Sequence, residues 1–202
     1  MGKVLITGGA GFIGCNAASR YLGRGDEVVV IDDLSRRGAA SNLEWLREQG
    51  DLRFHRTDIR DGAALERIFA AHADATLVLH LAAQVAVTTA VANPREDFEV
   101  NATGSFNVLE AARKAQLACP ILYSSTNKVY GELEDLPIRE SDDGYFFGEQ
   151  IRGVDEEQYL DFHSPYGCSK GAADQYGARA AGRAFSAHGE FHGRRRTGRA
   201  FD

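Results

Sequence analysis

The chain has 202 residues, of which 44% are hydrophobic and 26% charged, and this is enough for one α/β domain with its own core. Its net charge of −6 argues against nucleic acid as a partner. No apolar run reaches the roughly 18 residues that a membrane helix needs, so we expect no membrane partner.

Short apolar segments alternate with segments of helical spacing over the first 125 residues. The predicted strands are residues 3–7, 27–31, 52–56, 76–80 and 121–125, and the predicted helices are residues 11–22, 42–48, 63–71 and 98–114. Such alternation is typical of a parallel sheet covered on both faces. The sequence therefore predicts an α/β fold with a Rossmann-type doubly wound parallel sheet.

A glycine-rich turn follows the first predicted strand and opens the first helix. Gly8 permits a tight turn, Gly11 lets the backbone approach phosphates, and Gly14 allows close packing of helix on strand; Phe12 and Ile13 lie between them. The helix N-terminus can then hold a dinucleotide pyrophosphate. A glycine triplet can also be a simple turn.

The second predicted strand ends in Asp32 and Asp33. A carboxylate at this place can accept both ribose hydroxyls and repels a 2′-phosphate, which favours NAD over NADP. Arg36 and Arg37 weaken that preference, because an arginine could meet a phosphate. Asp32 could also be only a turn residue.

Two further strand ends carry candidate coenzyme residues. After the third strand, Asp58 can accept from an adenine amino group while Ile59 packs on the ring, although a helix N-cap is the alternative and Asp61 fits it. After the fourth strand, small side chains allow a coenzyme to lie against the backbone. These residues are Leu81, Ala82 and Ala83. We expect the neighbouring His80 to pack in the core.

Tyr166 and Lys170 are four residues apart and therefore share one helix face, with Ser164 as N-cap and Pro165 in the first turn. A lysine ammonium and an oxidised nicotinamide, both positive, favour the phenolate and lower the pKa of a tyrosine. Tyr166 can then take a proton from an alcohol as hydride leaves. Thr126, just after the fifth strand, can hydrogen-bond the reacting oxygen from the other side.

Residues 131–164 break the alternating pattern and are rich in acidic and aromatic side chains. A stretch of this length inside a compact domain is usually functional. We expect it to fold over the mouth of the active site, with a solvated surface loop as the alternative.

These motifs resemble the extended short-chain dehydrogenase/reductase family, which contains the nucleotide-sugar epimerases and dehydratases. The similar stretches are residues 33–39, 84–89, 123–131 and 160–176, and within the family they resemble the branch that acts on CDP-sugars. The resemblance implies tightly held NAD, a nucleotide-sugar substrate, a catalytic set of Thr126, Tyr166 and Lys170, and transient oxidation at C2 of the sugar. Asn127 and Lys128 stand where dehydratases carry an Asp-Glu pair, so dehydration is disfavoured.

The resemblance also implies a domain division. We expect an NAD-binding domain over residues 1–181 and a basic tail over residues 182–202, which holds five arginines against two acidic residues. Family members are usually longer, so we expect a truncated or frameshifted chain that lacks the substrate domain, with a disordered tail and little activity. Full-length members are expected to be homo-oligomers. A net dehydrogenase or reductase and a non-catalytic dinucleotide-binding module are the alternatives.

The three cysteines are odd in number and have no CxxC spacing. They are Cys15, Cys119 and Cys168. This pattern favours reduced thiols in the cytoplasm and gives no indication of a metal site.

Overall fold

The computed structural model describes residues 1–180 apart from residues 135, 143, 148–152 and 156. Its main sheet has five parallel strands in the order β3-β2-β1-β4-β5. These strands are β1 (Lys3–Thr7), β2 (Glu27–Asp32), β3 (Leu52–Arg56), β4 (Leu77–His80) and β5 (Ile121–Tyr123). The predicted Rossmann-type sheet is confirmed, and the predicted tail at 182–202 lies outside the described residues.

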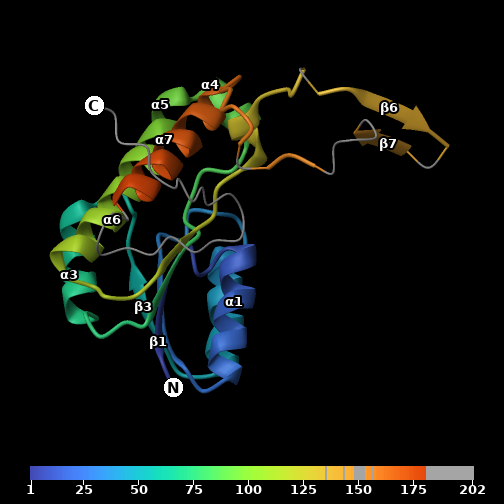
Figure 1. The fold of residues 1–202 in the computed structure, drawn as a ribbon. Coiled ribbons are helices and arrows are strands. Elements are labelled where there is room, and N and C mark those ends of the chain that lie inside the picture. Colours follow the sequence, from blue (N-terminus) through green and yellow to red (C-terminus); the bar gives the residue numbers. More distant parts are fainter. Residues whose placement is uncertain (135, 143, 148–152, 156, 181–202) are drawn as a thin grey trace.

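Helices cover both faces of this sheet. They are α1 (Phe12–Gly23), α2 (Ala39–Gln49), α3 (Gly62–Ala71), α4 (Val87–Ala92), α5 (Pro94–Phe98), α6 (Ser105–Lys114) and α7 (Pro165–Ala180), with a π-helical segment η1 (Glu99–Gly104) and a 3-10 turn η2 (Asn127–Tyr130). Figure 1 shows α1 on one side of the sheet and α3 and α6 on the other. No helix within the described part of the chain is both long and apolar enough to cross a bilayer.

Alternate residues of the strands supply two cores, because neighbouring side chains of a strand point to opposite faces. Val28 and Val30 of β2 pack with Cys15 and Ala18 of α1. Val29 and Ile31 of the same strand pack in the other core, under α3 and α6. This explains why the strands are apolar throughout instead of alternating.

The predicted helix at 98–114 is divided in the structure. It starts earlier, at Pro94, and passes through the π-helical segment η1 before α6 begins at Ser105. Gly104 ends that segment, and a Cβ there would lie 2.6 Å from Cδ1 of Ile59. Sequence periodicity did not reveal this interruption, nor the preceding α4.

Residues 131–164 contain an antiparallel hairpin formed by β6 (Ile138–Ser141) and β7 (Gly144–Phe147). Figure 1 shows this hairpin projecting away from the five-stranded sheet. The residues of β6 are all exposed, and no described residue of 131–164 lines the main pocket. The described part of the segment therefore does not line the pocket, and its expected place over the active-site mouth stays a prediction.

Candidate active site

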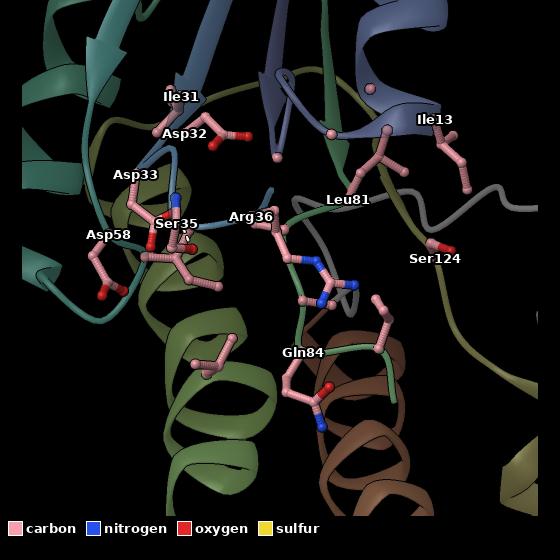
Figure 2. Close-up of a pocket in the computed structure, with 18 of the residues that line it drawn as sticks. Ile13, Ile31, Asp32, Asp33, Ser35, Arg36, Asp58, Leu81, Gln84 and Ser124 are labelled. Atoms are coloured by element: carbon pink, nitrogen blue, oxygen red, sulfur yellow. Dashed lines mark hydrogen bonds between the residues drawn. The ribbon is translucent and has the colours of Figure 1, made fainter. Parts of the chain in front are cut away.

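The main pocket has a volume of about 610 Å³ and lies where the C-terminal ends of β1, β2 and β4 meet. Figure 2 shows side chains from these strand ends turned toward a common space. All predicted coenzyme residues line it: Gly8, Gly11, Phe12, Ile13, Gly14, Asp32, Asp33, Asp58, Ile59, Leu81, Ala82, Ala83, Tyr166 and Lys170.

The glycine turn is built so that side chains could not fit. Gly8 has φ +69°, and a Cβ there would lie 2.6 Å from the backbone nitrogen of Ala82. A Cβ on Gly14 would collide with the carbonyl oxygen of Gly8. The turn thus brings β1, α1 and the loop after β4 into contact, and it leaves the start of α1 open toward the pocket.

Asp32 is fixed at the end of β2 by two backbone donors. Its Oδ2 accepts from Ala10 N at 3.0 Å and its Oδ1 accepts from Leu34 N at 2.8 Å. Burial raises the pKa of this carboxyl, against the effect of those donors. Each oxygen keeps a second lone pair, so the carboxylate can still accept from a ribose. Figure 2 shows the Arg36 side chain reaching into the pocket near this strand end.

Two roles were considered for the loop after β3, a helix N-cap and a coenzyme contact, and different aspartates lie at the two places. Asp61 caps α3, because its side chain accepts from Ala64 N at 2.9 Å. Asp58 lines the pocket and pairs with Arg60, whose Nη2 lies 2.6 Å from its Oδ2. The Arg60 guanidinium lowers the pKa of the Asp58 carboxyl. The adenine contact of Asp58 remains a prediction.

His80 lies beneath the pocket floor and is only 1% exposed. Its Nδ1 lies 2.6 Å from Thr7 Oγ1 and its Nε2 lies 2.9 Å from Ser105 Oγ. Burial lowers the pKa of His80 to about 3. The ring is therefore neutral and joins β1, β4 and α6, which confirms that it packs in the core.

Helix α7 brings the predicted catalytic pair to the pocket. Ser164 caps it, since its Oγ accepts from Gly167 N at 3.0 Å. Tyr166 is 8% exposed and Lys170 is 3% exposed, and both line the cavity. Lys170 Nζ donates to Ser124 O at 2.5 Å and lies 4.3 Å from the centre of the Tyr123 ring.

Burial dominates the electrostatics of this pair. It lowers the pKa of Lys170 to about 8 and raises the pKa of Tyr166, and a side-chain hydrogen bond with Thr126 opposes the second shift. Thr126 thus lies beside Tyr166, although it does not line the cavity itself. The chain's own groups raise the tyrosine pKa, so the expected lowering requires a further positive charge such as an oxidised nicotinamide.

Sequence reasoning missed a buried polar cluster behind α7. It joins Gln84, Asp97, Asn101 and Ser169 through side-chain hydrogen bonds. Asp97 and Asn101 are four residues apart and both are 1% exposed. Two polar residues at helical spacing within an otherwise packed segment were the only signal in the sequence. Among the described residues no group of three or more His, Cys, Asp or Glu side chains could hold a metal.

The family model described as GDP-mannose 4,6 dehydratase matches residues 5–185 of the chain. Over 174 residues the chain is 49% identical to CDP-paratose 2-epimerase from Salmonella typhi, covering 86% of this chain and 51% of that protein. A putative UDP-glucose 4-epimerase from Methanocaldococcus jannaschii is 34% identical over 173 residues, covering 86% and 49%. The chain thus spans about half the length of these two relatives.

Solved structures show the same fold. The UDP-Glc/GlcNAc 4-epimerase from Campylobacter jejuni superposes with a TM-score of 0.76 at 25% identity, over 90% of this chain and 49% of that one. The UDP-glucose 4-epimerase from Thermus thermophilus, in complex with NAD, gives a TM-score of 0.70 at 35% identity, over 89% and 50%.

Proposed function

The chain belongs to the GDP-mannose 4,6-dehydratase family of nucleotide-sugar epimerases and dehydratases, and we propose that it forms the coenzyme-binding and catalytic part of an NAD-dependent nucleotide-sugar epimerase. The observation that carries the proposal is the gathering of Tyr166 and Lys170 at one cavity with the glycine turn. Thr126, hydrogen-bonded to Tyr166, completes the catalytic set.

The donor set of the pocket fits NAD. The open start of α1 offers backbone N–H groups to a pyrophosphate, because the positions of Gly8 and Gly14 exclude side chains. Asp32 would accept from the ribose hydroxyls, and a negative charge there disfavours a 2′-phosphate. The NAD complex of the Thermus thermophilus relative supports the same assignment.

Bound NAD would supply a hydride acceptor and donor for the sugar carbon. In our proposal Tyr166 Oη removes the hydroxyl proton as the adjacent C–H bond gives up its hydride, so the alcohol becomes a ketone. The Lys170 ammonium and the positive charge of an oxidised nicotinamide would together favour the phenolate, and Thr126 would hold the reacting oxygen. After the ketone turns, Tyr166 Oη would give the proton back to the carbonyl oxygen as the carbon is reduced on its other face, so no net oxidation would result.

We further propose that the substrate is a CDP-sugar epimerised at C2, as the name of the Salmonella typhi relative says of that protein. Asn127 and Lys128 follow Thr126 in this chain. Neither residue can act as a carboxylate acid–base pair, which argues against the elimination of water. The CDP preference, the cytoplasmic location and a homo-oligomeric assembly of the full-length members belong to this proposal as well.

The test uses the purified chain. We expect acid-denatured protein to release NAD, and CDP-paratose deuterated at C2 to give a small amount of the C2 epimer with the label retained. Turnover should be weak, because the chain spans about half the length of its relatives. Tyr166→Phe serves as the control that removes the base. Loss of the label to solvent would contradict the mechanism, and stoichiometric release of NADH would favour a net dehydrogenase. Bound NAD with no detectable epimer, even after long incubation at high protein concentration, would favour the non-catalytic module.

A further inference from the structure

A buried carboxylate lies behind the catalytic helix. Asp97 of α5 is 1% exposed, and its two oxygens accept three hydrogen bonds. Its Oδ1 accepts from Gln84 Nε2 at 2.9 Å and from Asn101 Nδ2 at 3.1 Å. Its Oδ2 accepts from Ser169 Oγ at 2.5 Å. Because every neighbour donates, the cluster is suited to an ionised carboxylate, which only accepts.

This cluster is attached directly to the catalytic turn of α7. Ser169 immediately precedes Lys170, and its Oγ also lies 3.2 Å from the carbonyl oxygen of Tyr166. Asn101 Nδ2 donates to the same Oγ at 3.1 Å. The Asp97 carboxylate is therefore held next to the turn of α7 that carries Tyr166 and Lys170.

The ammonium of Lys170 needs such a charge. Lys170 is 3% exposed, and its ammonium donates to the carbonyl oxygen of Ser124, which carries only a partial charge. A fully buried lysine without a counter-ion can lose its proton at a pH as low as about 5–6. Uncharged, Lys170 could no longer favour the phenolate of Tyr166.

We propose that Asp97 is a positioning residue that acts as a buried counter-ion of the site, its charge helping to keep Lys170 protonated. This inference rests on the proposed function only for the role of the pair in catalysis. With an oxidised nicotinamide bound, Asp97 would also offset the second positive charge.

Other titratable groups face Lys170 from the packed elements. Asp174 on α7, which is half-buried, raises the lysine pKa more than the buried Asp97 does, so the two carboxylates act on Lys170 together. His80 on β4 is neutral, with its pKa lowered to about 3. On β5, burial raises the pKa of Tyr123, which keeps it neutral.

Asp97 acts on Tyr166 in the opposite direction, because its charge raises the pKa of that phenol. Replacing Asp97 by a neutral residue would therefore lower the pKa of both members of the pair. If Asp97 served only in packing, its replacement would not lower both pKa values. Titrations of Lys170 and Tyr166 therefore distinguish an effect of charge from an effect of packing.

The test is an NMR titration of lysine side chains labelled with ¹³C at Cε, in the chain itself and without coenzyme. The chain has four lysines, and Lys170→Met identifies the signal of Lys170. We expect a midpoint near 8 in the wild type. In Asp97→Asn, whose amide keeps the shape of the carboxylate, we expect the midpoint to fall by about one pH unit, a tenfold change in the ionisation constant.

Two matched variants separate charge from contact. Ser169→Ala removes a donor to Asp97 but keeps the charge, so its Lys170 midpoint should stay near that of the wild type. Glu99→Gln removes a partly exposed negative charge two residues from Asp97, and solvent screening should leave the midpoint unchanged.

An unchanged midpoint in Asp97→Asn, or equal shifts in Asp97→Asn and Ser169→Ala, would overturn the inference. If Asp97→Asn does not fold, a wild-type midpoint below about 6 would overturn it, because Lys170 would then behave as a buried lysine without a counter-ion. None of these readouts requires NAD or turnover, so failure of the proposed function would be seen separately.

Discussion

Two basic side chains are buried at the pocket, His80 beneath its floor and Lys170 in its wall, and burial lowers the pKa of both. They differ in their partners. His80 contacts two hydroxyl groups that suit a neutral ring, whereas Lys170 has carboxylates close enough to raise its pKa against the effect of burial. Of these two buried bases only Lys170 is positively charged near neutral pH, and it lines the pocket together with Tyr166.

The neutral state of His80 makes the fold sensitive to acid. Its pKa is about 3 in the folded chain and about 6.5 when unfolded. Between these values the unfolded chain binds one proton more, so stability is lost as pH falls, by about 1.4 kcal/mol per pH unit. We expect urea unfolding at pH 7.5 and 5.0 to show a smaller loss of stability in His80→Gln than in the wild type.

His55 and His72 also have lowered pKa values, so the variant should keep part of the pH dependence. The comparison between the two proteins therefore isolates the contribution of His80. Equal losses in both would mean that the ring is not held neutral.

The glycine turn gives a second prediction, in which Gly14→Ala is compared with Gly23→Ala. Both residues belong to α1, but a Cβ at Gly14 would collide with Gly8 O, whereas Gly23 has no atom within 4 Å of its Cβ position. We expect Gly14→Ala to cost about 1–3 kcal/mol of unfolding free energy and to abolish NAD binding, measured by urea unfolding and calorimetry. Gly23→Ala should be neutral or slightly stabilising, and equal behaviour of the two would refute the steric reading.

At the residue scale the sequence was most informative where a motif has a local physical cause. The glycine turn and Asp32 could be predicted because the conformation of each is set by its own segment of the chain. Both line the pocket. The role of Asp97 could not be predicted, because it depends on a contact with Ser169, which is 72 positions away in the chain.

At the scale of elements, the same contrast appears in the predicted helix at 98–114. Its apolar spacing predicted α6 correctly, since Val108 and Ala112 face the core. The π-helical segment η1 was not predicted because its cause is tertiary: Asn101 turns inward to the buried cluster, and Gly104 packs on Ile59.

The hairpin of β6 and β7 gives the third prediction. Its described residues are half-buried or exposed, and it stands apart from the sheet in Figure 1. We expect replacement of residues 137–147 by a short Gly-Ser linker to change the unfolding free energy by less than about 1 kcal/mol and to leave NAD affinity unaltered, as measured by urea unfolding and calorimetry. A loss of NAD binding would show that the segment does reach the site in solution.

At the scale of the whole molecule, the pocket follows from strand order. β1 is central, the chain runs outward to β2 and β3 on one side, and it then crosses to β4 and β5 on the other. Loops diverge at such a switch point and leave a crevice at the C-terminal ends of the strands. Alternating strands and helices in the sequence therefore predicted both the sheet and the place of the site, whereas the direction of the hairpin had no local signal.

Because the pocket is lined by β1, β2, β4 and α7 together, a ligand bound there should stabilise the whole domain and not one segment. At a concentration 100 times its Kd, NAD would add about 2.7 kcal/mol, which raises Tm by roughly 5–10 °C for a chain of this size. We expect NADP at the same concentration to give a smaller rise, since its 2′-phosphate would meet the Asp32 carboxylate. Thermal unfolding with each coenzyme measures both effects, and Asp32→Asn should narrow the difference between them. Equal stabilisation of the wild type by NAD and NADP would instead indicate that Arg36, which reaches into the same space in Figure 2, outweighs Asp32 in coenzyme choice.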